Sequence, residues 1–192
     1  MNRKKLKNTL IIGGARSGKS NYAQELALKC PQPVLFVATA EADDEEMRQR
    51  IEEHKKVRPS TWRTLEVTTH VGNQIRREIG EMQTVIVDCV TLLVNNIFSR
   101  YFNSSMELGD AAPVEKEVIA EISELVDCIS QVDASFIIVT NEVGLGIVPA
   151  ISMSRLYRDL LGRANQILAQ HTDEVYLMVA GLPVKIKPMR PG

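Results

Sequence analysis

The sequence predicts an α/β fold in which a mostly parallel β-sheet is flanked by helices. Short apolar runs alternate along the chain with stretches of helical periodicity, the pattern that parallel strands and their crossover helices produce. No internal repeat, low-complexity tract or linker interrupts this alternation, so residues 1–192 are predicted to form a single domain. A glycine-rich segment at 13–20 follows the first apolar run and precedes the first helical pattern. The sheet edge at which it lies is where open α/β sheets bind ligands.

The first half of the chain switches quickly between strand and helix signals. A charged stretch at 43–56 begins with four acidic residues, which the helix dipole favours at its N-terminus, and Pro59 ends it. The predicted elements are, in order, a strand at 9–12, a helix at 21–29, a strand at 34–38, a helix at 43–56, a strand at 64–67 and a helix at 71–79.

The second half has longer elements. Apolar residues three and four apart between Pro113 and Val132 predict a long helix. A glycine-bearing loop at 141–149 follows a buried apolar run. The predicted elements are a strand at 84–88, a helix at 90–102, a polar loop at 103–112, a helix at 113–132, a strand at 135–140, a helix at 155–170 and a final strand at 174–180.

Composition excludes several classes of protein. The net charge is −1, so no overall positive field attracts nucleic acid or an anionic membrane. No apolar stretch approaches the roughly 18 residues of a transmembrane helix. The basic segment 1–7 is predicted to be a flexible extension, because the apolar run behind it is too short for a signal peptide. Cys30, Cys89 and Cys128 lack metal-ligand spacing and are predicted to be reduced thiols in a cytoplasmic protein.

The segment 13–20 fits the phosphate-loop pattern G-x-x-x-x-G-K-[ST] without a mismatch, and a strand and a helix flank it as the motif requires. Glycines allow the backbone to wrap around phosphates, and the helix N-terminus favours the anion. Lys19 is predicted to reach the β- and γ-phosphates, and the Ser20 hydroxyl to ligate Mg²⁺. A chance glycine-rich turn is the alternative. The predicted nucleotide-binding residues here are Gly13, Gly14, Ala15, Arg16, Ser17, Gly18, Lys19 and Ser20, and the fold is therefore expected to be P-loop NTPase-like.

Asp88 ends an apolar strand and is the predicted partner of Ser20. A carboxylate in this position of a P-loop protein holds Mg²⁺ directly or through water. Its alternative role is to cap the following helix. The metal role is favoured, because the strand is otherwise wholly apolar.

His54 allows two interpretations. By spacing it lies on the same helical face as Met47 and Ile51, as a half-buried histidine of an amphipathic helix does. Its setting is cationic, however, and nearby cations keep an imidazole neutral and nucleophilic near pH 7. The same cations suit a triphosphate held for attack at phosphorus. The cationic neighbours are Arg48, Arg50, Lys55, Lys56 and Arg58.

Polar residues in the late loop and helix also allow two interpretations, as phosphate or subunit contacts or as a solvated helix face. His70 and His171 are predicted to lie at the surface, and Trp62 and Tyr157 to be packing residues. The late polar residues are Glu142, Arg155, Arg158, Asp159 and Arg163.

Ordered segments along nearly the whole chain resemble the bifunctional adenosylcobinamide kinase/adenosylcobinamide-phosphate guanylyltransferases of cobalamin biosynthesis. This set is far more specific than a phosphate loop alone. The segments are GGARSGKS at 13–20, VAT at 37–39, RIEEHK at 50–55, RP at 58–59, WRTLE at 62–66, VTNEVG at 139–144, GIVP at 146–149, RDLLGRANQ at 158–166 and DEVYL at 173–177.

The resemblance implies two reactions on one scaffold. ATP or GTP phosphorylates the aminopropanol hydroxyl of adenosylcobinamide. GMP then passes from GTP to that phosphate through a guanylylated histidine, giving adenosylcobinamide-GDP and pyrophosphate. The matching histidine is His54, and the family is homotrimeric.

The resemblance also maps nucleotide contacts onto this chain beyond the phosphate loop. Two departures from the family pattern are Asp88, where members often carry glutamate, and Lys56-Val57, which replace a more polar pair. The implied contacts are Ala38, Thr39, Ala40, Lys55, Lys56, Val57, Arg58, Glu66 and Asp88.

Two rival functions use the same loop. A P-loop small-molecule or nucleoside kinase would need no covalent histidine. A GTPase switch would carry N-K-x-D after a strand, where this chain has Thr140-Asn141-Glu142-Val143. A nucleic-acid motor fits neither the charge nor the length.

Overall fold

The computed structural model describes residues 7–41, 45, 48–49, 58–102 and 111–188. Its sheet has seven strands in the order β3-β2-β4-β5-β1-β6-β7, and every pairing is parallel except that of β6 with β7. The predicted mostly parallel sheet is confirmed. The strands are β1 Thr9–Gly13, β2 Val34–Ala38, β3 Arg63–Glu66, β4 Thr84–Asp88, β5 Ser135–Asn141, β6 Glu174–Val179 and β7 Leu182–Lys187.

The last strand was not predicted, because 174–180 was expected to end the sheet. A two-residue turn at 180–181 instead returns the chain as antiparallel β7, with Val179 paired to Leu182. In the sequence of β7, LPVKIK, a proline and two lysines interrupt the apolar residues, and the strand is almost wholly exposed, so it lacks the uninterrupted apolar run of a buried strand. Pro183 is compatible with β7 because this strand lies at the sheet edge.

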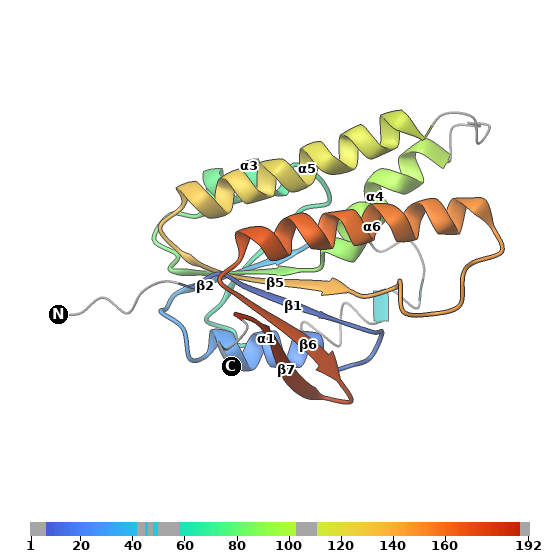
Figure 1. Ribbon diagram of the computed structural model, residues 1–192. Helices are drawn as coiled ribbons and strands as arrows, with labels where there is room; N and C mark the ends of the chain where they lie inside the picture. Colours follow the sequence, from blue (N-terminus) through green and yellow to red (C-terminus); the bar gives the residue numbers. More distant parts are fainter. Residues whose placement is uncertain (1–6, 42–44, 46–47, 50–57, 103–110, 189–192) are drawn as a thin grey trace.

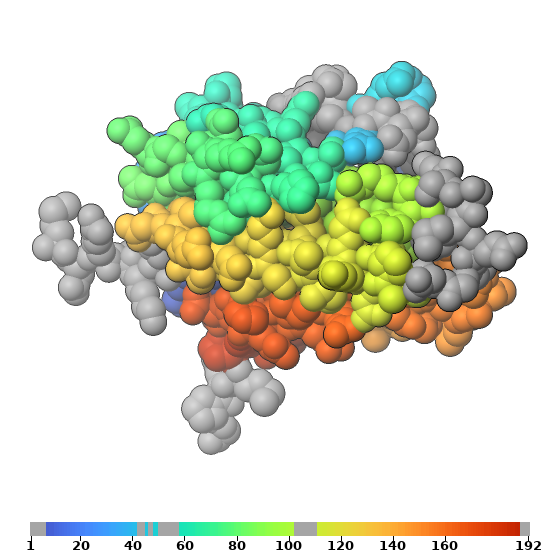
Figure 2. Space-filling model, turned by 90° about the horizontal axis from the view of Figure 1, so that it is seen from above, coloured from blue at the N-terminus to red at the C-terminus, as the bar shows by residue number. Residues whose placement is uncertain are grey.

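Helices cover both faces of the sheet. Figure 1 shows α1 on one face and α3, α4, α5 and α6 on the opposite face, and Figure 2 shows α5 lying between α3 and α6. The predicted helix at 43–56 lies largely outside the described residues, as does most of the loop at 103–112. None of the described helices is both long and apolar enough to cross a membrane. The helices are α1 Lys19–Ala27, α3 Val71–Glu78, α4 Val90–Phe102, α5 Ala112–Gln131 and α6 Ser152–His171.

Successive residues of each central strand supply the two cores in turn. In β5, Phe136 and Ile138 pack under the helices α3 to α6, while Ile137 and Val139 pack under α1. Such strands are apolar throughout because both faces of a parallel sheet are covered. Trp62 packs in the α1-side core, so its predicted packing role is confirmed.

Several surface predictions can be checked in the structure. Tyr157 packs edge-on against Phe98 and donates its hydroxyl to the Thr91 carbonyl, so its predicted packing role is confirmed. His70 and His171 are exposed, also as predicted. Lys7, the last residue of the predicted extension, pairs with Glu174 at 2.7 Å, and residues 1–6 lie outside the described part. None of the three cysteines, all of them described, forms a disulfide.

Candidate nucleotide site

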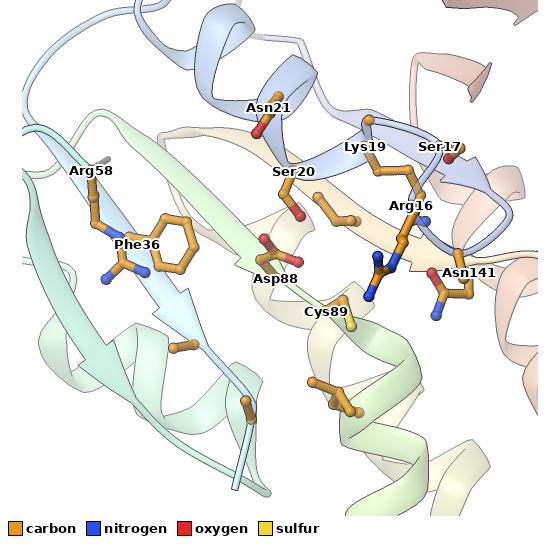
Figure 3. Close-up of a pocket in the computed structure, with 16 residues that line it drawn as sticks. Arg16, Ser17, Lys19, Ser20, Asn21, Phe36, Arg58, Asp88, Cys89 and Asn141 are labelled. Atoms are coloured by element: carbon orange, nitrogen blue, oxygen red, sulfur yellow. The ribbon is translucent and has the colours of Figure 1, made fainter. Parts of the chain in front are cut away.

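A cavity of about 410 Å³ opens at the carboxyl edge of the sheet, bounded by the phosphate loop, α1 and the ends of β2, β4 and β5. Figure 3 shows its two sides: Lys19, Arg16 and Asn141 on one, and Arg58 with Phe36 on the other. Ten residues predicted from the sequence line it: Ala15, Arg16, Ser17, Gly18, Lys19, Ser20, Ala38, Ala40, Arg58 and Asp88.

The phosphate loop depends on glycine at two points. A Cβ on Gly13 would lie 2.6 Å from the Met178 carbonyl oxygen, so no side chain fits there. Gly18 has φ +94°, in the left-handed region that favours glycine, and precedes the first residue of α1. The loop therefore delivers the chain to a helix N-terminus, where free N–H groups favour an anion.

Lys19 lies at the back of the loop. Its side chain is 7% exposed, and Nζ donates a hydrogen bond of 2.6 Å to the Gly14 carbonyl oxygen. Burial lowers the pKa of Lys19, while the nearby Asp88 carboxylate acts in the opposite direction. A phosphate oxygen entering the cavity would give this buried ammonium an anionic partner, which strengthens the interaction.

Ser20 and Asp88 point toward one another across the cavity (Figure 3). Ser20 lies in the first turn of α1, and Asp88 ends β4 between Ala38 of β2 and Val139 of β5. Hydroxyl and carboxylate oxygens are ligands that suit Mg²⁺, which takes its remaining ligands from water and phosphate. Among the described residues no group of three His, Cys, Asp or Glu side chains forms a separate metal site. The donor set therefore fits a nucleotide-bound Mg²⁺.

Arg58 forms the opposite wall with two side chains that strand register places together. The register pairs Phe36 of β2 with Thr64 of β3. The Arg58 guanidinium carbon lies 3.5 Å from the centre of the Phe36 ring, and Nη1 donates a 2.7 Å hydrogen bond to Thr64 Oγ1. Burial lowers the pKa of Arg58, opposed by the carboxylates of Asp88 and Glu66. Stacking and hydrogen bonding thus orient a half-buried cation at the cavity.

Four predicted contacts among the described residues do not line the cavity. Thr39 is fully buried, and its hydroxyl donates to the Cys89 carbonyl oxygen at 2.7 Å and accepts from the Cys89 N–H at 2.8 Å. This residue joins the end of β2 to the start of α4. Glu66 is exposed at the end of β3. Gly13 and Gly14 shape the loop without lining the cavity. His54, Lys55, Lys56 and Val57 lie outside the described residues, so their predicted roles remain predictions.

Six lining residues were not predicted. Two of them follow or end a strand at the same sheet edge as Asp88, Cys89 after β4 and Asn141 at the end of β5, which is the signal that identifies them once the strand order is known. The other four lie within helices α1 and α4 or within strands β2 and β5. Burial, together with the charge of Asp88, raises the pKa of Cys89 to about 12, so this residue is a neutral thiol. The six residues are Asn21, Phe36, Cys89, Leu92, Val139 and Asn141.

The late arginines have partners within the chain. Arg155 donates to the carbonyl oxygens of Pro149 and Ala150, which fastens the loop before α6. Arg158 pairs with Asp159, and Arg163 pairs with Glu115 of α5. None of the three arginines lines the cavity.

A parallel sheet with a phosphate loop between β1 and α1, and an aspartate ending a nearby strand, defines the P-loop class of nucleotide-binding proteins. A solved ATPase, EscN from the enteropathogenic E. coli type III secretion system, shares this fold with a TM-score of 0.56. The two are 11% identical, and the match covers 91% of this chain and 43% of that one.

Within that class the chain belongs to the cobinamide kinase / cobinamide phosphate guanyltransferase family, whose model matches residues 9–186. It is 41% identical over 179 residues to the bifunctional adenosylcobalamin biosynthesis protein CobU of Salmonella typhimurium, covering 93% of this chain and 98% of the relative. The bifunctional adenosylcobalamin biosynthesis protein CobP of Pseudomonas aeruginosa is 38% identical over 178 residues, covering 93% and 96%. The resemblance seen in the sequence is confirmed.

Proposed function

We propose that this protein catalyses both reactions of its family. It phosphorylates adenosylcobinamide with ATP or GTP, then transfers GMP from GTP to adenosylcobinamide phosphate, giving adenosylcobinamide-GDP and pyrophosphate. The observation that carries this proposal is the cavity where the buried Lys19 ammonium, the N-terminus of α1 and the Asp88 carboxylate converge.

Phosphoryl transfer requires charge stabilisation more than covalent chemistry from the protein. Lys19 supplies a fixed positive charge next to the α1 N-terminus, and Ser20 and Asp88 would hold Mg²⁺. When bound, Mg²⁺ neutralises negative charge on the transferring phosphates. These groups serve the kinase step and also anchor GTP for the second reaction.

For the second step, His54 is proposed as the nucleophile. A neutral ring nitrogen attacks the α-phosphorus of GTP, the bond to the β-phosphate breaks, and pyrophosphate leaves. A phosphate oxygen of adenosylcobinamide phosphate then attacks the same phosphorus, breaks the P–N bond and frees the histidine. Support comes from the cationic sequence around His54 and from Arg58, four residues later, which lines the cavity. Four extended residues span at most about 14 Å.

The whole function is tested by incubating the protein with adenosylcobinamide, GTP and MgCl₂ and analysing the corrinoids by mass spectrometry. Adenosylcobinamide-GDP is expected, with the monophosphate accumulating when GTP is replaced by ATP. A protein that binds GTP but leaves adenosylcobinamide unmodified contradicts the proposal.

The covalent step is tested with [α-³²P]GTP. Wild-type protein is expected to carry a label that is lost in acid and kept in base, as a phosphoramidate is, while [γ-³²P]GTP leaves no such label. His171→Ala is the matched control, because this exposed histidine lies at the end of α6 and does not line the cavity. If His54→Ala accepts the label as the control does, another residue is the nucleophile.

A P-loop nucleoside or small-molecule kinase is the alternative. Phosphorylation of a nucleoside without α-phosphate labelling favours it.

The homotrimer that the family resemblance implies is proposed for this chain as well. Light scattering after size-exclusion chromatography tests it by giving the number of chains per particle. A cytoplasmic location is proposed because none of the three described cysteines forms a disulfide, and cell fractionation tests it.

A further inference from the structure

The turn that joins β6 to β7 lies against the phosphate loop. Gly181 donates its N–H to the Ser17 carbonyl oxygen at 3.0 Å. A Cβ on Gly18 would lie 3.2 Å from the Gly181 Cα, so the two segments touch through their main chains. Figure 1 shows the tip of this hairpin beside the chain that runs from β1 to α1.

The geometry of the turn explains why its N–H is available. Ala180 and Gly181 form a two-residue hairpin loop with φ values of +53° and +83°, the signature of a type I′ turn. In such a turn the closing hydrogen bond joins the residues on either side, so the second central N–H is free to donate elsewhere. An alanine rarely adopts positive φ, and Ala180 does so next to the loop.

The hairpin is linked through the loop to the lysine that faces the cavity. Ser17 accepts from Gly181 and donates its own N–H to the Gly14 carbonyl oxygen at 3.3 Å. The same Gly14 oxygen accepts the 2.6 Å bond from Lys19 Nζ. A continuous chain of hydrogen bonds therefore runs from the turn to the Lys19 ammonium.

A second contact holds the start of the loop. Gly13 pairs with Met178 near the end of β6, and the approach is so close that no Cβ fits at Gly13. Met178 is 2% exposed. The hairpin thus contacts the loop at its first residue and again at Ser17 and Gly18.

We propose that the 180–181 turn is a positioning element for phosphate binding, with Gly181 as its key residue. It holds the Ser17–Gly18 segment so that the loop N–H groups converge before the nucleotide arrives. Preorganised donors bind more tightly because no ordering cost is incurred on binding. Gly181 does not itself line the cavity, and the inference rests on the proposed nucleotide site.

The test compares two glycines that both have positive φ but lie in different parts of the fold. Gly181 and Gly80 both have positive φ, and a Cβ at either would meet no atom within 4 Å. Gly80 lies between α3 and β4, at the amino edge of the sheet. Gly181→Val and Gly80→Val should both lower the melting temperature, since a β-branched residue resists positive φ.

The affinity for mant-GTP in the presence of Mg²⁺ should differ between the two valine variants. Gly181→Val is expected to weaken this binding about fivefold to tenfold, because a valine that leaves the positive-φ conformation moves its N–H away from the Ser17 carbonyl oxygen and one ordering hydrogen bond is lost. Gly80→Val should bind as wild type. Gly181→Asn should restore most of the affinity, because asparagine tolerates the left-handed region and so leaves the N–H directed at the Ser17 carbonyl oxygen.

Wild-type affinity in Gly181→Val, with a loss of stability matching Gly80→Val, overturns the inference. If Gly181→Val does not fold, hydrogen exchange on the wild type decides: nucleotide should slow exchange of the Gly181 amide, and unchanged exchange is the contrary result. Lys19→Ala keeps the two proposals apart. If Lys19→Ala binds mant-GTP as wild type does, the nucleotide site itself is contradicted. If Lys19→Ala loses mant-GTP binding but Gly181→Val keeps wild-type affinity, only the role of the turn is contradicted.

Discussion

The two walls of the cavity are held in place in different ways. The phosphate loop is fixed by main-chain hydrogen bonds, in which Ser17 donates to Gly14 and accepts from Gly181. The opposite wall is fixed by side chains, with Arg58 stacked on Phe36. The first wall needs glycines and a particular backbone path. The second wall needs a set of side chains that strand register aligns, so substitutions there should change geometry and leave the phosphate loop intact.

Lys19→Ala should produce the largest effect on nucleotide binding. Among the described residues of the phosphate-loop wall, Lys19 is the one charged side chain that is buried. Nucleotide affinity should fall about 100-fold or more, as expected for a charged hydrogen-bonding partner of phosphate. Calorimetric titration with GTP and Mg²⁺ measures it. Lys116→Ala, at an exposed position on α5, is the control, and equal affinity in the two variants rules out the phosphate-loop role.

Asp88→Asn tests the residue that lies between the walls. Removing the carboxylate should slow both reactions about 100-fold and raise the Mg²⁺ concentration needed for half-maximal rate, because a neutral amide binds Mg²⁺ poorly. Asp88→Glu, the residue that family members often carry, should keep most of the activity. An Asp88→Asn enzyme with an unchanged Mg²⁺ requirement contradicts the metal role.

Thr64→Val tests the second wall with little change in shape. It removes the hydroxyl that accepts from Arg58 Nη1, and the guanidinium loses one of its two restraints. A charge-assisted bond of this kind is worth about 1.5 kcal/mol, so kcat/KM for guanylyl transfer should fall about tenfold. Serine at position 64, which keeps a hydroxyl, should retain activity. A loss of GTP affinity as large as that of Lys19→Ala would show that the walls are not separate.

Glu174→Gln should have the smallest effect on function, since it lies at the start of β6, away from both walls. Burial tends to raise the pKa of Glu174, but hydrogen bonds from Lys185, Lys7 and Tyr176 outweigh it and lower the pKa to about 2. The ionised carboxylate therefore stabilises the fold fully at pH values above 4.5, the ordinary pKa of a glutamate. This stabilisation is lost as the pH falls through the lowered pKa of about 2.

Melting curves measure this contribution. Glu174→Gln should melt about 2–4 °C below wild type at pH 7, and the difference should shrink toward pH 2. Affinity for GTP should be unchanged at pH 7. A difference in melting temperature that does not vary with pH contradicts the electrostatic explanation.

The phosphate-loop wall could be predicted from sequence because its residues are contiguous. Eight positions with a fixed spacing specify both the backbone path and the chemistry. Asp88 was also predictable, since a carboxylate at the end of an apolar strand has few other uses. The positions of four strands were also predictable from the sequence. β1, β2, β4 and β5 are buried on both faces, so each appears in the sequence as an uninterrupted apolar run.

The second wall could not be predicted in full. Phe36 reads as one more apolar residue of a buried strand, and only the pairing of β2 with β3 brings it beside Thr64 and Arg58. Thr39 was expected to face the nucleotide, but its hydroxyl is used within the protein by Cys89. The contact between the β6–β7 hairpin and the phosphate loop was not predicted, because β7 itself was not predicted. Proline and lysines interrupt the apolar residues of β7, and Ala-Gly is not among the residue pairs that most strongly indicate a hairpin turn.

The pairing of Phe36 with Thr64 affects what fraction of a protein preparation is catalytically active. β3 has only four residues and lies at the edge of the sheet, where pairing is least constrained. A slip of one residue would turn every side chain of β3 to the other face and leave Arg58 without its acceptor. Such a misregistered molecule would keep its phosphate loop and bind nucleotide, yet turn over slowly. Active-site titration of a preparation would count it as competent, so specific activity would vary between batches whose GTP-binding capacity is identical.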